Sequence, residues 1–305
     1  MGIVSVVGSF VYDLVAKAPR RPKTGETLIG ESFGMFLGGK GANQAIASSR
    51  SGASVHMIGR LGNDLFGNQF LEKFSNEGIS TDFVVIDDVN GTGVGMPLID
   101  ATGDNSIVLI PQANMALSVD DVNNAFEPIA SSDVLILQLE VPIDASQRAA
   151  EIAKENNTMV LLNPAPAREI PDSFLRLVDV LIPNEIETEI LSGMKTTTND
   201  QAIEAARALT SKGISTVILT LGHRGALLLT DEIEKGVPGF AIEAVDTTAA
   251  GDAFCGALAT SLAQGSTIED AVWVANAAGA LAVTKLGAEP SLPKKADLDQ
   301  FLAVN

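Results

Sequence analysis

Short apolar runs rich in β-branched residues alternate with helical patterns along most of the chain, and no other feature constrains the fold as strongly. Strands buried on both faces have continuous apolar sequences, so this alternation predicts a doubly wound, mostly parallel α/β sheet with helices on both faces. The predicted strands are residues 3–7, 55–59, 134–139, 159–163, 180–183, 216–221 and 226–230. The predicted helices are residues 42–51, 67–77, 145–155, 200–212, 249–264 and 268–284, of which the last two are Ala-rich and have no strand between them.

Two segments interrupt this alternation. Residues 11–37 show no helical pattern and contain several Gly and Pro residues, whereas residues 92–110 read as two alternating strands joined by a hairpin around Thr102-Gly103-Asp104. A β excursion built from two separate insertions predicts a small β-sheet lid over a site, within one domain that spans residues 1–305. Ordinary surface hairpins are the alternative interpretation of the same segments.

Composition limits the partners. The chain has 20 Lys and Arg against 38 Asp and Glu, a net charge of −18 that opposes binding to nucleic acid and to anionic membrane surfaces. A nucleotide can still bind, because local backbone dipoles and a metal ion offset the global charge. The single cysteine, Cys255, excludes an intrachain disulfide and is expected to be an inert core thiol. With no apolar run near the roughly 20 residues of a membrane span, we expect a soluble protein of a reducing cytoplasm.

The strongest chemical signal is the segment VDTTAAGDAF, residues 245–254. It predicts a strand that ends at Val245 and a helix that begins near Ala249. Backbone N–H groups at a helix start are unpaired, so they can hold a phosphate or stabilise a transferring phosphoryl group. Ala250 and Gly251 leave that surface bare. Asp252 in the first turn can accept the proton of an attacking hydroxyl, although a carboxylate there also simply complements the helix dipole.

A second glycine-rich segment is LGGKGANQA, residues 37–45. The sequence from residue 34 to 41 nearly matches a P-loop, but Gly41 stands where Ser or Thr would bind Mg²⁺, which disfavours a P-loop NTPase. A glycine turn that enters a helix would instead let the backbone, Lys40 and Asn43 approach a hydroxyl-rich ligand. A tight turn without a ligand is the alternative.

Two further segments follow predicted strands, where ligand sites of doubly wound sheets usually lie. In IPNEIE, residues 182–187, Asn184 and Glu187 can orient water around Mg²⁺ or can simply cap a helix. In LTLGHRG, residues 219–225, a turn flanked by glycines can cradle a nucleotide or form a hairpin. His223 in that turn is expected to be exposed and is assigned no role.

Together these segments resemble the ribokinase-like family of sugar kinases, and the match runs nearly end to end. The matching segments are GSFVYD (8–13), LGGKGANQA (37–45), LQLE (137–140), LNPAP (162–166), PNEIE (183–187), TLGHRG (220–225), VDTTAAGDAF (245–254) and GAEPSLP (287–293). The resemblance implies a ribokinase-like fold whose members often dimerise through the β lid. It also implies ATP-dependent phosphorylation of D-ribose at O5, with Mg²⁺ and often K⁺.

The resemblance also implies roles for individual residues. Asp252 would be the catalytic base, and Ala249, Ala250 and Gly251 would form the anion hole around the γ-phosphate. The positions that hold the sugar would be Val11, Asp13, Gly39, Lys40, Asn43, Glu140 and Asp252. The positions that contact ATP and its Mg²⁺-bound water would be Asn184, Glu187, Thr220, Gly222, Gly225, Gly251 and Asn276. The K⁺ ligands, by side chain or backbone, would be Asp246, Thr248, Ala282, Lys285, Gly287 and Ser291.

Val11 departs from the family pattern. Ribose kinases of the family typically have Asn at this position, which bonds the sugar, whereas deoxyribose kinases have an apolar residue. A site built on a bond to a hydroxyl discriminates by up to ~10⁴-fold, while an apolar pocket rejects an added hydroxyl only ~10²-fold. Val11 therefore makes 2-deoxyribose or another pentose the second hypothesis.

Two hypotheses come from other classes. A non-catalytic sugar or nucleotide sensor on this fold would be expected to have lost Asp252 or Gly251, and both are present. A Rossmann dehydrogenase needs a Gly-rich fingerprint after the first strand, which residues 8–13 lack.

Overall fold

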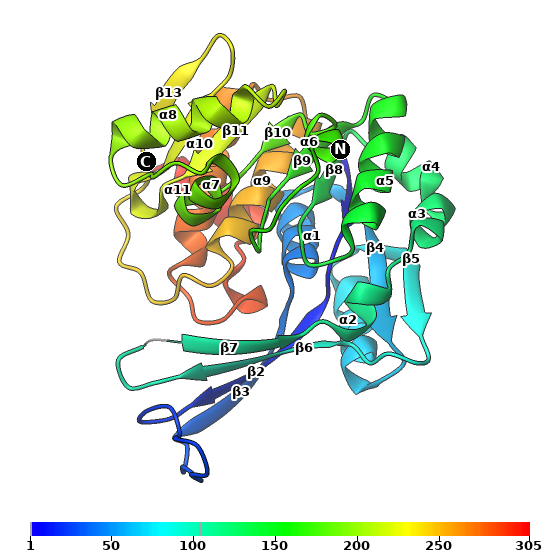
Figure 1. Ribbon diagram of the computed structural model, residues 1–305, viewed down its shortest axis with the longest axis vertical. Coiled ribbons are helices and arrows are strands. Elements are labelled where there is room, and N and C mark those ends of the chain that lie inside the picture. The colour runs from blue at the N-terminus through cyan, green and yellow to red at the C-terminus, as the bar shows by residue number, and fades with distance from the viewer. Residues whose placement is uncertain (1, 104) are drawn as a thin grey trace.

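The computed structural model describes residues 2–103 and 105–305, and within them the chain forms a nine-stranded sheet and a separate four-stranded sheet (Figure 1). The large sheet has the strand order β13-β12-β11-β10-β9-β8-β1-β4-β5. Its neighbours pair in parallel except for β11 with β12 and β12 with β13. Its strands are β1 (Ile3–Val7), β4 (Ser54–Gly62), β5 (Ser80–Asp87), β8 (Val134–Leu137), β9 (Met159–Leu162), β10 (Val180–Leu181), β11 (Thr216–Thr220), β12 (Ala226–Leu229) and β13 (Glu234–Val237).

Helices cover both faces of this sheet, as the alternation predicts. Val6 and Val7 of β1 point into the two separate apolar cores that result. One core contains α1 (Lys40–Ser51), α2 (Leu65–Asn76), α9 (Ala250–Ala263), α10 (Ile268–Ala282) and α11 (Lys295–Leu302). The other contains α3 (Val119–Asn124), α4 (Phe126–Ala130), α5 (Ile143–Glu155), α6 (Asp172–Leu175), α7 (Glu185–Ser192) and α8 (Asn199–Thr210). The 3-10 turns are η1 (Gln112–Ala116), η2 (Gly222–Arg224) and η3 (Glu289–Ser291).

The two predicted insertions build the small sheet, which projects from the edge of the main body in Figure 1. Its order is β3-β2-β6-β7, with β2 (Val11–Lys17), β3 (Ser32–Gly38), β6 (Gly93–Ile99) and β7 (Asn105–Ile110). Asp13 of β2 stands opposite Phe36 of β3 on one side and Gly95 of β6 on the other. Asp104, part of the predicted hairpin, lies outside the described residues.

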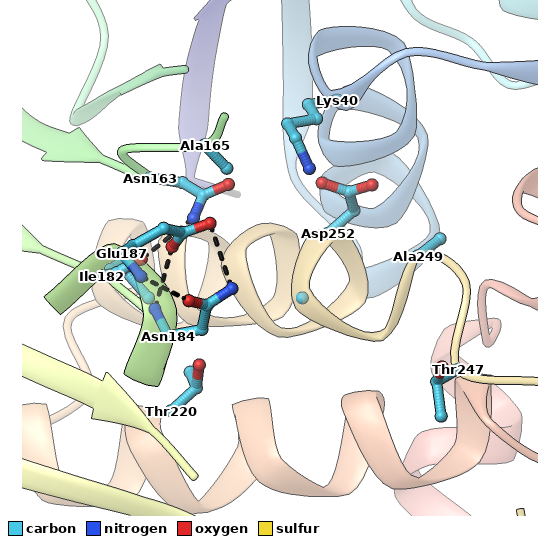
Figure 2. A pocket seen from close by; sticks show the side chains of 11 residues that line it. Lys40, Asn163, Ala165, Ile182, Asn184, Glu187, Thr220, Thr247, Ala249 and Asp252 are labelled. Carbon is cyan, nitrogen blue, oxygen red and sulfur yellow. Dashed lines mark hydrogen bonds between the residues drawn. The ribbon is translucent and has the colours of Figure 1, made fainter. Parts of the chain in front are cut away.

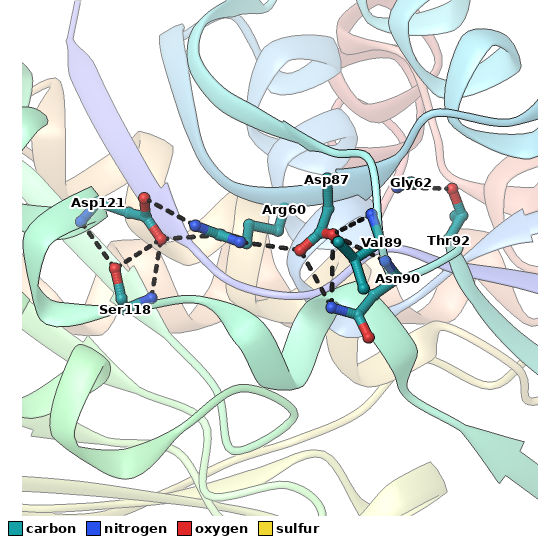
Figure 3. A network of polar contacts seen from close by, with 8 residues as sticks. All are labelled: Arg60, Gly62, Asp87, Val89, Asn90, Thr92, Ser118 and Asp121. Atoms are coloured by element: carbon teal, nitrogen blue, oxygen red, sulfur yellow. Dashed lines mark hydrogen bonds and ion pairs between the residues drawn. The ribbon is translucent and has the colours of Figure 1, made fainter.

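Arg60 ties the end of β5 to α3, next to the segment that leads into the small sheet (Figure 3). From β4 its guanidinium donates to Asp87 (2.8 Å) at the end of β5 and to Asp121 (2.9 Å) in α3. The same Asp87 carboxylate accepts the backbone N–H groups of Val89 and Asn90, which lead into β6. The segment that enters the β6–β7 hairpin and the helix that follows it are thus held at one point.

One expectation about strands was wrong. Residues before Val245 form no strand, because the N–H groups of Val245 and Asp246 both donate to Val283 O at the end of α10 and not to a neighbouring strand. The predicted strand at residues 226–230 is confirmed as β12. It pairs antiparallel to β11, as in the hairpin alternative for residues 219–225, because the turn between them is far shorter than the dozen or so residues of a parallel crossover.

Two expectations from composition concern burial and membranes. Cys255 is a buried free thiol inside α9, and burial raises its pKa well above the ordinary value, which fits an inert core residue. Over the described residues, no helix combines the length and the apolar character needed to cross a membrane.

Candidate active site

A pocket lies at the carboxyl ends of the parallel strands, where polar side chains from several elements converge (Figure 2). This edge of a doubly wound sheet is where such folds bind ligands. Among the predicted residues, those that line the pocket are Lys40, Asn184, Glu187, Thr220, Ala249, Gly251 and Asp252. The lining residues that sequence reasoning missed are Asn163, Ala165, Ile182 and Thr247.

Asp252 stands in the first turn of α9 and is 6% exposed. Its two carboxylate oxygens accept hydrogen bonds from the side-chain amides of Asn43 and Gln44, each at 2.9 Å. Burial raises the pKa of Asp252, while the charge of Lys40 and the two amide donors oppose that rise. Asp252 is therefore a buried carboxyl group whose pKa is raised overall and whose charged form is favoured by three neighbouring groups, Lys40, Asn43 and Gln44.

The start of α1 carries the second charged group of the pocket. Burial disfavours the charge on Lys40, but the carboxylates of Asp252, Glu140 and Glu187 outweigh burial and raise its pKa. Glu140, after β8, accepts the backbone N–H of Lys40 (2.9 Å) and the hydroxyl of Ser9. Gly39 caps α1 with a φ of 86°, and an added Cβ there would lie 2.6 Å from the backbone nitrogen of Val11.

The turn before α9 leaves backbone N–H groups open to the pocket. Ala249 is the N-cap with a φ of 60°, a left-handed conformation that is rare for alanine. The first bond of the helical ladder runs from Ala253 N–H to Ala249 O (2.8 Å), so the N–H groups of Gly251 and Asp252 precede the ladder. Ala249 and Gly251 line the pocket, and the half-buried Ala250 lies between them.

Asp13 of the small sheet sits between two glycine backbones. A Cβ added to Gly38 would lie 2.4 Å from the Asp13 carboxylate, and a Cβ added to Gly95 would lie 2.1 Å from it. A side chain at either position would therefore displace this carboxylate. Burial, followed by the charge of Glu140, raises the pKa of Asp13 to about 6. The Val11 side chain lies beside it, because the same Gly95 Cβ would lie 3.3 Å from a Val11 methyl.

Asn184 and Glu187 form the capping box of α7. The Asn184 side chain accepts Glu187 N–H (2.8 Å), and Asn184 N–H donates to the Glu187 carboxylate (2.9 Å). The helix-cap interpretation is thus correct, and both side chains also line the pocket beside Thr220. Burial raises the pKa of Glu187. Over the described residues, no group of three or more His, Cys, Asp or Glu side chains is arranged so that it could hold a metal ion.

The other predicted nucleotide contacts lie around the β12–β13 edge, outside the pocket lining. The side-chain amide of Asn276 on α10 donates to Val237 O (3.2 Å) and Pro238 O (3.3 Å). Gly225 is pressed against the same segment, where an added Cβ would lie 2.1 Å from Val237 O. Gly222 and His223 are exposed in the turn between β11 and β12.

Three of the predicted cation ligands, Asp246, Thr248 and Gly287, are joined by hydrogen bonds just before α9 begins. Asp246 accepts Thr248 N–H (2.9 Å) and hydroxyl (2.7 Å) with one oxygen and Gly287 N–H (2.9 Å) with the other. Although burial opposes its charge, these bonds lower the pKa of Asp246. Ser291 is fully buried, and Lys285 N–H donates to Ala282 O (3.3 Å) in the adjoining turn. A carboxylate oxygen whose charged form is favoured in this way is a ligand that can bind a monovalent cation.

Residues 1–295 match the sequence model of the pfkB family carbohydrate kinase. The chain belongs to this carbohydrate kinase family. It is 40% identical over 299 residues to a ribokinase of Haemophilus influenzae, covering 98% of both chains, and 38% identical over 303 residues to a deoxyribokinase of Salmonella typhi, covering 99% of both. The structure of Arabidopsis thaliana ribokinase with ribose and ATP superposes with a TM-score of 0.92 at 31% identity, covering 99% of both chains.

Some of the site residues of this carbohydrate kinase that were not predicted are nevertheless indicated in part by the sequence. Asn163 lies in LNPAP, directly after β9, and a polar residue at the carboxyl end of a parallel strand is typical of a ligand site. Gln44 follows Asn43 in LGGKGANQA, yet nothing in the pattern shows that both amides reach Asp252. Thr247 and Ile182 carry no chemical signal of their own.

Proposed function

We propose that this sugar kinase transfers the γ-phosphoryl group of ATP to the O5 hydroxyl of a pentose, with D-ribose as the lead substrate. The observation that carries the proposal is Asp252: a buried carboxyl group in the first turn of a helix whose open N–H groups border the same pocket. Relatives named ribokinase support the choice of sugar, as does the match to a ribokinase structure that contains ribose and ATP.

Binding of the sugar falls to groups of the small sheet and of the start of α1. Asp13 accepts sugar hydroxyls from the small sheet, while Lys40 and Asn43 approach from the start of α1, assisted by Gly39 and Glu140. The small sheet then acts as a lid that limits water at the reacting centre. Holding the terminal hydroxyl against the phosphoryl group supplies much of the rate enhancement in phosphoryl transfer.

Asp252 accepts the proton of O5 as that oxygen attacks the γ-phosphorus, and ADP leaves with the electrons of the broken P–O bond. The N–H groups around Ala249, Ala250 and Gly251 stabilise the charge on the transferring group. Asn184, Glu187 and Thr220 face the phosphates, and Gly222, Gly225 and Asn276 form the base-side edge. Mg²⁺ held through water by Asn184 and Glu187 would neutralise phosphate charge. K⁺ near Asp246 and Ser291 would stabilise the anion-hole turn.

Asp252→Asn tests the role of the base. Removal of a general base is expected to lower kcat by about 10²–10⁴-fold, measured by coupled ADP release with ribose, while ATP binding measured by calorimetry persists. Asp270→Asn is the matched control, because Asp270 occupies the first turn of the neighbouring α10 and is exposed. Turnover of Asp252→Asn equal to that of the control would refute the assignment.

A second candidate substrate is 2-deoxyribose. Val11 supports it, because an apolar methyl group lies beside Asp13 and can form no hydrogen bond to a sugar hydroxyl. The deoxyribokinase relative points the same way. The ratio of kcat/KM for ribose and 2-deoxyribose decides between them: a ratio within about 10² either way fits an apolar contact, whereas a ribose preference near 10⁴ would sink the deoxyribose hypothesis.

A second copy of the chain is the partner we propose for the small sheet. Apolar side chains of its two edge strands are exposed, among them Phe33 and Met35 on β3 and Ile107 and Val108 on β7. Exposed apolar sheet edges of this kind usually pair or are covered. Sedimentation equilibrium tests the proposal: a dimer that dissociates on Ile107→Asp supports it, and a monomer at all concentrations contradicts it.

A further inference from the structure

A line of buried amide side chains leads to the carboxylate of Asp252. Gln138, which follows β8, donates a hydrogen bond from its side-chain NH₂ group to the side-chain oxygen Oε1 of Gln44 at 2.7 Å. Gln44 in turn donates to Asp252 Oδ1 (2.9 Å) and to Asn163 Oδ1 (3.2 Å). Asn163 donates to the backbone carbonyl of Ile182 at 2.9 Å. Gln138 and Gln44 are both fully buried, so water does not replace these partners.

The backbone oxygen of Ile182, at one end of this line, determines which group donates and which accepts in each hydrogen bond. An Asn or Gln amide can present either its oxygen or its NH₂ group, and neighbours decide which. The backbone oxygen of Ile182 can only accept, so Asn163 must direct its NH₂ group there and its oxygen toward Gln44. Gln44 then faces two acceptors, Asn163 Oδ1 and the Asp252 carboxylate, and only its NH₂ group satisfies both.

Gln138 secures the opposite end of the Gln44 amide. Its NH₂ group occupies the Gln44 oxygen, which leaves the Gln138 oxygen buried without a hydrogen-bond partner among the described residues. That oxygen lies against Gly8, where an added Cβ would come within 2.1 Å of it. An unpaired buried oxygen is unfavourable, so the orientation of the Gln138 amide is maintained by the hydrogen bond that its NH₂ group donates to Gln44.

We propose that Gln44 is a positioning residue for the catalytic base, held in one amide orientation by Asn163 and Gln138. This amide relay (Gln138, Gln44, Asn163) fixes the rotation of the Asp252 carboxylate, so that its remaining lone pairs point into the pocket. The inference rests on the proposed kinase function. It also links the base to Ile182, which precedes the proposed nucleotide contact Asn184.

The relay has an electrostatic consequence. Asp252 faces Lys40 from α1, Glu140 from the segment after β8 and Glu187 from α7, with Cys255 one turn along its own helix. Burial raises the pKa of Asp252, and the amide donors together with Lys40 oppose that rise. Removing the Gln44 donor therefore raises the pKa further, and the acid limb of the kcat–pH profile moves to higher pH.

Gln44→Met tests the relay, because methionine retains the size of glutamine and cannot donate. A hydrogen bond to a charged group corresponds to about a tenfold to hundredfold change, so we expect kcat to fall by that factor with both KM values nearly unchanged. The matched control is Ser48→Ala, one turn along α1. Its buried hydroxyl bonds Gln44 O and Gly256 O of α9 but does not touch Asp252.

Asn163→Ala is the second variant. Because Asn163 acts through Gln44, Asn163→Ala should also move the acid limb of the kcat–pH profile to higher pH, but by less than Gln44→Met does. The double variant Gln44→Met/Asn163→Ala should move the acid limb no further than Gln44→Met alone. An acid limb unmoved by Gln44→Met, a Ser48→Ala variant that matches it, or additive shifts in the double variant would each overturn the relay.

If the unsubstituted protein phosphorylates no sugar, the proposed function fails and the relay is still testable. ¹³C NMR of the side-chain carboxyl carbon (Cγ) of labelled aspartate follows the Asp252 titration without turnover. A higher Asp252 pKa in Gln44→Met than in Ser48→Ala supports the relay, and equal pKa values overturn it.

Discussion

Arg50→Met should be among the most destabilising single substitutions outside the active site. Arg50 ends α1 with a side chain that is 8% exposed and forms ion pairs with Glu77 (2.6 Å) and Glu289. Its guanidinium also donates to the backbone carbonyls of Glu289 and Leu292, each at 2.9 Å. Methionine retains the apolar stem and removes every one of these donors.

The magnitude follows from the two carboxylates left behind. Breaking a buried ion pair by removing one partner costs about 3–5 kcal/mol, because the other charge stays buried and uncompensated. Lys73 remains within 3.0 Å of Glu77 and 2.8 Å of Glu289, so the lower value of about 3 kcal/mol is expected. An unfolding entropy of about 2.1 cal/mol/K per residue gives about 0.64 kcal/mol/K for this chain, which converts the loss into a fall in Tm of about 5 °C.

Differential scanning calorimetry measures the fall, and Arg207→Met is the matched control. The ion pair of Arg207 with Glu234 is open to solvent, with side chains 60% and 39% exposed. Surface pairs of this kind contribute at most about 1 kcal/mol, so the control should lose less than about 1.5 °C. Equal Tm values for the two variants would refute the reasoning that burial and backbone anchoring make the Arg50 cluster strong.

Three further outcomes are expected. Gly95→Ala places a methyl group 2.1 Å from the Asp13 carboxylate, so the KM for the sugar should rise while the KM for ATP stays constant. The control is Gly236→Ala, whose added methyl group meets no neighbouring atom. An unchanged KM for the sugar in Gly95→Ala would contradict the assignment of Asp13 to sugar binding. Because the pKa of Asp13 is raised to about 6, protonation below that pH removes an acceptor, so the sugar KM should rise between pH 7 and pH 5 and Asp13→Asn should abolish that dependence. Replacing K⁺ with tetramethylammonium should lower kcat, and Asp246→Asn should respond less; equal sensitivity would exclude Asp246 as the cation ligand.

Much of the fold could be predicted because parallel strands that are buried on both faces have continuous apolar sequences. The predicted β1, β8, β9, β10 and β11 all occur within two residues of their expected ends. The strands that the pattern missed, β5 and β13, lie at the two edges of the large sheet. Edge strands are partly exposed, so their sequences mix apolar and polar residues and resemble loops: Glu234 to Gly236 are all exposed. Residues 234–237 form a strand because they pair with β12, and the sequence of the segment itself does not indicate this pairing.

The site divides along a similar line. Residues whose chemistry depends on their own type and on a strand or helix end, such as Asp252 and Lys40, could be located from the sequence. The amide relay could not, because the role of Gln44 depends on direction: the same amide would oppose the Asp252 carboxylate if it were rotated by half a turn. That direction originates at the carbonyl of Ile182, a backbone group that every residue possesses. Hence the sequence points to the residues proposed to react, while the residues proposed to orient them can be found only when β8, β9, β10, α1 and α9 meet in three dimensions.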